Sequence, residues 1–146
     1  MMSTVLSVKD ALVELLGDSV PSGVQVQYGD DIDKALPQRV FIGDIEEADG
    51  QLVTLRPGRR EENYLVRVMI DVQHVASARS ADARALEVLG TIETLLADDP
   101  KFAGATSPPP IVSAYLERWN LQSTVTSDAW RTLIEVEIRV KARLLP

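Results

Sequence analysis

One histidine and no cysteine limit the nucleophilic chemistry that this sequence can support. The lack of cysteine excludes thiol nucleophiles, thiolate metal sites and disulfides. A Ser/His/Asp set would depend on His74, the kind of side chain that serves most often as a general base near neutral pH. His74 falls on the inward face of a predicted strand, in phase with Tyr64 to Val72. The pattern therefore predicts a structural histidine, and we assign no catalytic residue.

Acidic pairs and glycines add no further site. A metal site or a glycosidase site needs carboxylates that converge in a cleft. The neighbouring carboxylates of this chain fall in predicted turns and helix ends, where we expect them to be solvated: Asp30-Asp31, Glu46-Glu47, Glu61-Glu62 and Asp98-Asp99. The 8 glycines are isolated and lack phosphate-loop or dinucleotide spacing. We expect no metal, no cofactor and no enzymatic activity.

Three arginines stand out in the segment RPGRR, because the chain is acidic overall. Arg56, Arg59 and Arg60 surround a predicted turn and are followed by Glu61 and Glu62. Guanidinium groups pair bidentately with carboxylates or phosphates, so this tip could bind a partner. The alternative is a solvated turn whose charges the two glutamates partly offset. These arginines are the candidate partner-binding residues.

The spacing of apolar residues predicts two helices and five or six strands. One helix covers Val8 to Leu16, with Ser7 and Asp10 as an approximate capping box. A second begins after Ser77 or Ser80 and stops before Pro100, and an extended, stiff connector follows at 101–110. Alternating apolar and polar residues predict the strands, at residues 24–28, 39–45, 64–72, 113–126 and 129–144.

These elements predict an α+β fold with a mixed, mostly antiparallel sheet, both helices packed on one face and the other face polar. Residues 46–62 carry turn signals at Asp49-Gly50 and Pro57-Gly58, and we expect them to form a protruding β-hairpin arm. Trp130 is in phase with the apolar face of the last strand and is predicted to lie in the core. Trp119 fits the core and the surface equally well.

Length, charge and the absence of long apolar runs indicate what kind of protein the chain is. The chain has 146 residues, which suits a single domain spanning 1–146. Its formal charge of −7 disfavours wrapping nucleic acid with the general surface, since such binding requires Lys and Arg against phosphates. No secretory signal and no apolar run of membrane-spanning length is evident, so we expect a protein made and used in a cytosol, without membrane contact.

The order of the predicted elements resembles the tail terminator family of long-tailed bacteriophages, also called tail completion or minor tail proteins. The segments that carry the resemblance are VKDALVELLGD (8–18), RVFIGDIEE (39–47), RREENYLVRVMIDV (59–72), ADARALEVLGTIETLLADDP (81–100) and TLIEVEIRVKARL (132–144). The resemblance covers nearly the whole chain.

The resemblance implies a virion structural protein of the tail or neck, assembled in the host cytoplasm. Six copies would form a ring that caps the tail tube, ends its polymerisation and joins the head to the tail. The implied partners are further copies of the chain, the tail tube protein and the head-tail connector or stopper, with DNA passing through the lumen as a further candidate. The alternatives are a neck or head-completion connector of the same virion, and a small cellular ligand-binding or enzymatic domain.

We predict that replacing Arg56, Arg59 and Arg60 together by Ser impairs assembly but not folding. Exposed charges contribute about 0–1 kcal/mol each to stability, so the melting temperature should barely move. A desolvated charge pair at an interface costs about 2–5 kcal/mol when one partner is removed. A complementation assay should therefore give overlong or headless tails. Normal tails would identify the cluster as a solvated turn, and an unfolded variant would show that the arginines are structural.

Overall fold

The computed structural model describes residues 3–52, 60–74, 76–125 and 129–144, and for residues 47–52, 60 and 144 it describes the backbone only. Helix α1 (Val5–Ser19) is followed by strand β1 (Gln25–Gln27) and a short 3-10 turn, η1 (Ile32–Lys34). Next come strands β2 (Gln38–Leu52) and β3 (Arg60–His74), helix α2 (Ala78–Asp98), and strands β4 (Ile111–Val125) and β5 (Trp130–Leu144).

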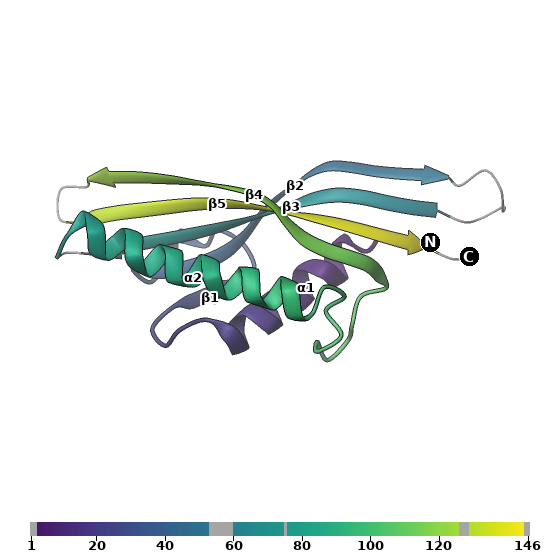
Figure 1. Cartoon of the computed structure of the whole chain (residues 1–146), viewed down its shortest axis with the longest axis horizontal. Helices are drawn as coiled ribbons and strands as arrows, with labels where there is room; N and C mark the ends of the chain where they lie inside the picture. Colours follow the sequence, from purple (N-terminus) through teal and green to yellow (C-terminus); the bar gives the residue numbers. More distant parts are fainter. Residues whose placement is uncertain (1–2, 53–59, 75, 126–128, 145–146) are drawn as a thin grey trace.

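The described strands form one mixed sheet in the order β1-β2-β3-β5-β4. The short β1 pairs in parallel with residues 39–41 of β2, and all other neighbours are antiparallel. Both helices lie on the same side of this sheet (Figure 1). The predicted α+β class, with two helices on one face of a mostly antiparallel sheet, is confirmed, and the number of described strands is five.

Helix α1 is longer than its apolar spacing predicts, because a tertiary contact fixes its start. The predicted capping box at Ser7 and Asp10 is wrong. Thr4 is the N-cap, and its backbone N–H donates to Glu62 Oε1 on β3 (2.7 Å). The Thr4 hydroxyl also bonds with the Tyr64 hydroxyl (2.8 Å), whose burial raises the pKa of Tyr64. Sequence spacing within one helix could not show these partners on a distant strand.

Helix α2 follows the sequence closely. Of its two candidate caps, Ser77 is the N-cap, and its Oγ accepts a bond from the N–H of Ser80 (3.0 Å). The helix ends at Asp98, before Pro100, as predicted. The connector that follows is not extended throughout, because Asp99 accepts bonds from the N–H groups of Ala103 and Gly104 (2.8 and 2.9 Å). This turn inserts Phe102 into the core.

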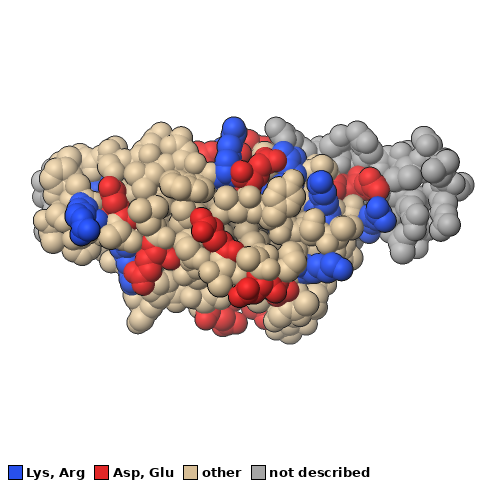
Figure 2. Space-filling model, viewed as in Figure 1, with Lys and Arg blue, Asp and Glu red and all other residues tan. Residues whose placement is uncertain are grey.

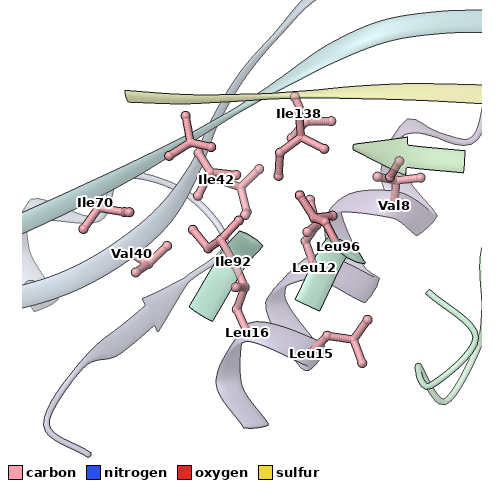
Figure 3. Packing of buried hydrophobic residues seen from close by; sticks show 14 of the residues in the cluster. Val8, Leu12, Leu15, Leu16, Val40, Ile42, Ile70, Ile92, Leu96 and Ile138 are labelled. Carbon is pink, nitrogen blue, oxygen red and sulfur yellow. The ribbon is translucent and has the colours of Figure 1, made fainter. Parts of the chain in front are cut away.

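The core lies between the helices and the inner face of the sheet. Every second residue is buried there from Tyr64 to Val72 of β3 and from Ile134 to Ala142 of β5, as are the apolar stripes of α1 and α2. Figure 3 shows side chains from all these layers meeting: Val8, Leu12, Leu15 and Leu16 of α1, Val40 and Ile42 of β2, Ile70 of β3, Ile92 and Leu96 of α2, and Ile138 of β5. Trp130, predicted to join them, is 37% exposed because it begins β5 at the rim of this layer.

The four long strands are longer than the helices that cover them. Each has 15 residues, which is about 50 Å of chain, whereas the 21 residues of α2 extend only about 32 Å. The far ends of β2 and β3 therefore project beyond both helices, and the β4–β5 hairpin points to the opposite end of the molecule (Figure 1).

The projecting part of β2 and β3 corresponds to the predicted arm, with one correction. Asp49 and Gly50 do not turn the chain but pair with Asn63 and Glu62 inside the hairpin. Strand β2 has more residues than the part of β3 that it pairs with. The residues of β2 without a partner lie at two register shifts, one between Ile42 and Ile45 and one between Glu46 and Asp49. The second turn signal, Pro57-Gly58, lies outside the described residues.

We predict that Ile92→Ala destabilises the protein by about 2–5 kcal/mol, because it leaves a cavity under the sheet where Ile92 is fully buried. Leu86→Ala, an exposed position on the same helix, is the matched control and should change stability by no more than about 0.5 kcal/mol. Urea unfolding of the two variants measures the difference. Equal effects would contradict the position of the core.

Candidate assembly surface

Two stretches of the sheet edge have backbone groups with no neighbouring strand among the strands that the structure describes. Strand β4 pairs only with β5, and no strand lies on its other side, where the N–H of Ala114 donates to the carbonyl oxygen of Pro100 (2.7 Å). Strand β2 is covered by β1 only at residues 39–41, which leaves its edge open from Ile42 to Leu52. Unpaired edges of this length are templates for pairing with another strand.

The face of the sheet opposite the helices carries a row of alternating charges that crosses all four long strands. Arg67 on β3 bonds with Glu46 on β2, and its Nε lies 2.7 Å from Glu135 Oε1 on β5. Arg118 on β4 donates from Nε and Nη2 to the two carboxylate oxygens of Glu137 on β5 (2.6 and 3.1 Å). The row therefore starts with an acid at the β2 edge and ends with a base at the β4 edge.

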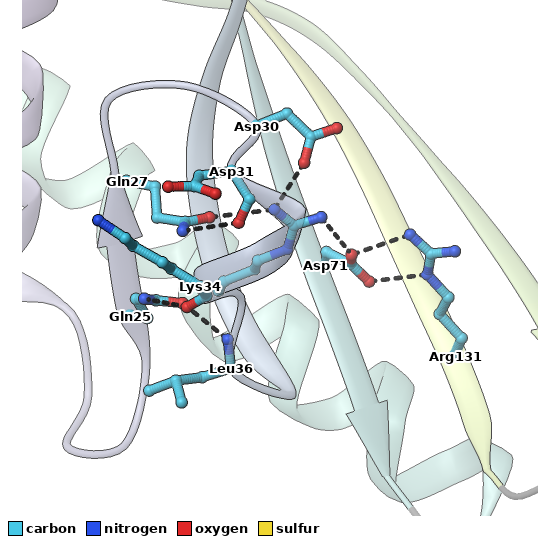
Figure 4. A network of polar contacts seen from close by, with 9 residues as sticks. Gln25, Gln27, Asp30, Asp31, Lys34, Leu36, Asp71 and Arg131 are labelled. Carbon is cyan, nitrogen blue, oxygen red and sulfur yellow. Dashed lines mark hydrogen bonds and ion pairs between the residues drawn. The ribbon is translucent and has the colours of Figure 1, made fainter.

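Two further clusters flank this row. On one side, Arg139 on β5 binds Glu117 on β4 (3.1 Å) and Asn63 on β3 (2.9 Å). On the other side, Asp71 on β3 accepts two bonds from Arg131 on β5 (2.8 and 2.9 Å) and a third from Arg39 on β2 (3.3 Å). Figure 4 shows Asp71 and Arg131 facing each other, with Asp30 at the far side of the cluster.

Glu137 is the most buried carboxylate of the central row, since its side chain is only 6% exposed. Hydrogen bonds from Arg118 lower the pKa of Glu137, with smaller contributions from the charges of Arg118, Arg67 and Arg139, while burial opposes the shift. The same bonds raise the pKa of Arg118. Both groups are therefore charged throughout the physiological range.

The β4 edge also presents apolar side chains. Val112, Tyr115 and Trp119 are each 43–45% exposed. Trp119 pairs with Val136 and so lies on the helix side of the sheet, while Tyr115 pairs with Arg139 on the charged side. Trp119, whose position the sequence left open, is thus a surface residue. Exposed aromatic side chains beside an open edge are typical of contact surfaces.

The structure does not test the three candidate arginines. Arg56 and Arg59 lie outside the described residues. Arg60 begins β3, where its backbone pairs with Leu52 and Leu144. Only the backbone of Arg60 is described. Over the described surface seen in Figure 2, basic and acidic side chains are interspersed and form no large patch of one sign.

The other candidate groups have local partners. Nδ1 of His74 accepts a bond from the N–H of Ala76 (3.2 Å) near the start of α2. Among the acidic pairs, which were expected to be solvated, Asp30 and Glu46 are 48% and 40% exposed, and they also bind Arg39 (2.7 Å) and Arg67. Glu62 accepts a bond from Thr4. The described part of the chain has no group of three or more His, Asp and Glu placed to hold a metal ion, and none of its helices could cross a membrane.

Sequence reasoning missed the charged row. The alternation of β5 predicted that Glu135, Glu137 and Arg139 face away from the core, and this is confirmed. Their partners come from β3 and β4, so the pairing of strands decides which charges meet. Opposite charges at every second position of several long strands were the available signal.

Neither a protein-family model nor a curated protein matches the sequence. Among solved structures, the fold is similar to that of a chain in the virion of a native gene transfer agent particle, with a TM-score of 0.57 and 12% identity. The match covers 97% of this chain and 100% of the other. The two chains therefore share a fold over their whole lengths.

We predict that Glu137→Gln lowers stability at pH 7 by about 1–2 kcal/mol, because Arg118 and Arg67 lose a charged partner. The pKa of Glu137 is lowered in the folded state, so its contribution is complete above the ordinary value of 4.5 and is lost as the pH falls below it. Urea unfolding between pH 7 and pH 3 should show a smaller loss in the variant than in the parent.

Glu93→Gln, which removes an exposed carboxylate on α2, is the control for that measurement. Its stability should follow that of the parent at every pH. If Glu137→Gln also follows the parent, the central row does not contribute to folding.

Proposed function

We propose that this chain is a structural protein of a tailed, phage-like virion that forms a ring of six copies on the end of the tail tube. The ring ends polymerisation of the tube and offers the surface to which the head-tail connector or stopper attaches. No step of this function is catalytic. The protein would reside in the tail or neck of the virion after assembly in the host cytoplasm.

The two open edges of the sheet are the observation that supports a ring best. They lie on opposite sides of one sheet and differ from each other, one belonging to β4 and the other to the projecting half of β2. Contacts between two different surfaces are head-to-tail contacts, which close into a ring when the rotation per copy allows it. A two-fold dimer would instead use one of these surfaces twice.

The shared fold gives independent support. The chain shares its fold with a chain of a gene transfer agent virion, over 97% of its own length and all of the other chain's. The number of copies comes from the resemblance to tail terminators. In this proposal Arg56, Arg59 and Arg60 contact the tail tube protein, the connector or the DNA in the lumen.

We predict that the full-length protein forms particles of six-fold mass as its concentration rises or when tube ends are added. Native mass spectrometry or analytical ultracentrifugation over a range of concentrations measures the mass, and electron micrographs with purified tubes show where the rings bind. The physical reason is mass action on a weak, repeated edge contact.

Only monomer at every concentration, together with bare tube ends, would contradict the proposal. Rings that bind filled heads and ignore tubes would instead identify the neck connector of the same virion. Arg79→Glu, which changes an exposed charge on α2, should assemble like the parent and serves as the control.

A further inference from the structure

We propose that Arg118 of one copy pairs with Glu46 of the next copy, and that this ion pair sets the register of β4 against β2 at the interface between copies. This inference rests on the proposed ring and specifies its contact surface. The partner on the open β4 edge is thus a second copy of this chain, bound through the open part of its β2.

The outer face of the sheet carries charges that alternate in sign from one edge to the other. Across the sheet the central row reads Glu46, Arg67, Glu137, Arg118, which is acid, base, acid, base. The inner two members are 25% and 6% exposed, whereas Arg118 is 74% exposed and Glu46 is 40% exposed. The exposed ends have opposite signs. A second copy beside the first therefore continues the same alternation without placing like charges together.

Strand direction allows this continuation. Strands β2 and β5 run one way and β3 and β4 run the other way, because each long strand is antiparallel to its neighbour. A second copy added in the same orientation places its β2 antiparallel to β4 of the first. The interface then repeats the hydrogen-bond pattern already present inside each copy. The alternation of charges and the backbone hydrogen-bond pattern thus both require the second copy to have the same orientation as the first.

The lengths of the two edges also agree. If Arg118 lies opposite Glu46 of the next copy, residues 42–49 of β2 face about residues 115–122 of β4. That stretch falls inside β4, which runs from Ile111 to Val125, and it begins after Ala114, whose N–H bonds with Pro100. The covered part of β2, at residues 39–41 beside β1, falls opposite about residues 123–125. Strand β1 therefore ends the contact before the last three residues of β4.

The helix side of the sheet gives a second match in the same register. Trp119 lies beside Arg118 on the opposite face and is 45% exposed. Ile45 lies beside Glu46, pairs with Val66 and packs against the edge of the core. In the proposed register Trp119 faces Ile45 of the next copy, so an apolar contact forms under the ion pair. A shift by one residue would bring each charge to the wrong face.

The experiment uses two full-length variants, Arg118→Glu and Glu46→Arg, first separately and then mixed. Each variant alone places like charges at every interface, and the concentration needed for half-assembly should rise at least about tenfold. In an equimolar mixture, alternating copies place the introduced glutamate opposite the introduced arginine at one interface and restore the native pair at the next. Assembly should return to within about threefold of the parent, measured by analytical ultracentrifugation.

The controls are Arg79→Glu and Glu93→Arg, which make the same charge changes on the exposed face of α2 and should assemble like the parent. Normal assembly of either interface variant alone, or failure of the mixture to recover, would overturn the ion pair while the parent's rings leave the proposed function standing. A parent that forms no ring would overturn both.

Each charge variant also places like charges together within one copy, because Arg118 pairs with Glu137 and Glu46 pairs with Arg67. If a variant folds poorly for that reason, a cross-linking experiment tests the inference instead. The chain has no cysteine, so Trp119→Cys and Ile45→Cys introduce single thiols in separate preparations. Directly opposite residues of antiparallel strands lie about 4.5–5.5 Å apart between Cα atoms, which a disulfide can span. Mixing and mild oxidation should give disulfide dimers. Glu93→Cys mixed with Ile45→Cys should give none, and equal yields would overturn the register.

Discussion

The burial of one face of a four-strand antiparallel ribbon is the constraint on which the rest of this structure depends. Alternate residues of β3 and β5, among them Val68, Ile70, Val136 and Ile138, are fully buried against two helices. Because successive side chains of a strand point to opposite faces, this burial also fixes which residues occupy the other face. Those residues have no helix layer above them, and their polar groups must be satisfied within the sheet or by water.

The outer face meets that requirement with ion pairs between strands. Glu137 is nearly as buried as a core residue, yet it has Arg118 and Arg67 beside it. Ionised groups at such positions are tolerated only when they are paired and hydrogen-bonded. The pairs link β2, β3, β5 and β4 across the direction of the strands, in addition to the backbone ladder. Each pair needs a neighbouring strand, so the row ends at the edges of the sheet. It ends in an acid, Glu46, at the β2 edge and in a base, Arg118, at the β4 edge.

Long stretches of the two sheet edges have no neighbouring strand among the described residues. Two helices cover only part of strands that are about 50 Å long, and the short β1 covers only three residues of β2. A monomer with long open edges is exposed to uncontrolled pairing, and proteins usually cover or interrupt such edges. Here the two edges end the central row with opposite charges, and in the proposed ring each edge pairs with the other edge of a neighbouring copy.

The sequence by itself determined the local periodicities. It predicted both helices, a cap at Ser77 or Ser80, the stop before Pro100, the central part of each strand and the face of β5 that is buried, since all of these follow from spacing within one segment. It did not determine the start of α1, which depends on Glu62 of β3, or the continuation of β2 through Asp49 and Gly50, which depends on pairing with β3. Nor could it show that Glu46, Arg67, Glu137 and Arg118 form one row. Those residues lie on four different strands, which the order β2-β3-β5-β4 brings together. Charge pairs across a sheet are contacts between segments distant in sequence, so only the tertiary structure decides them.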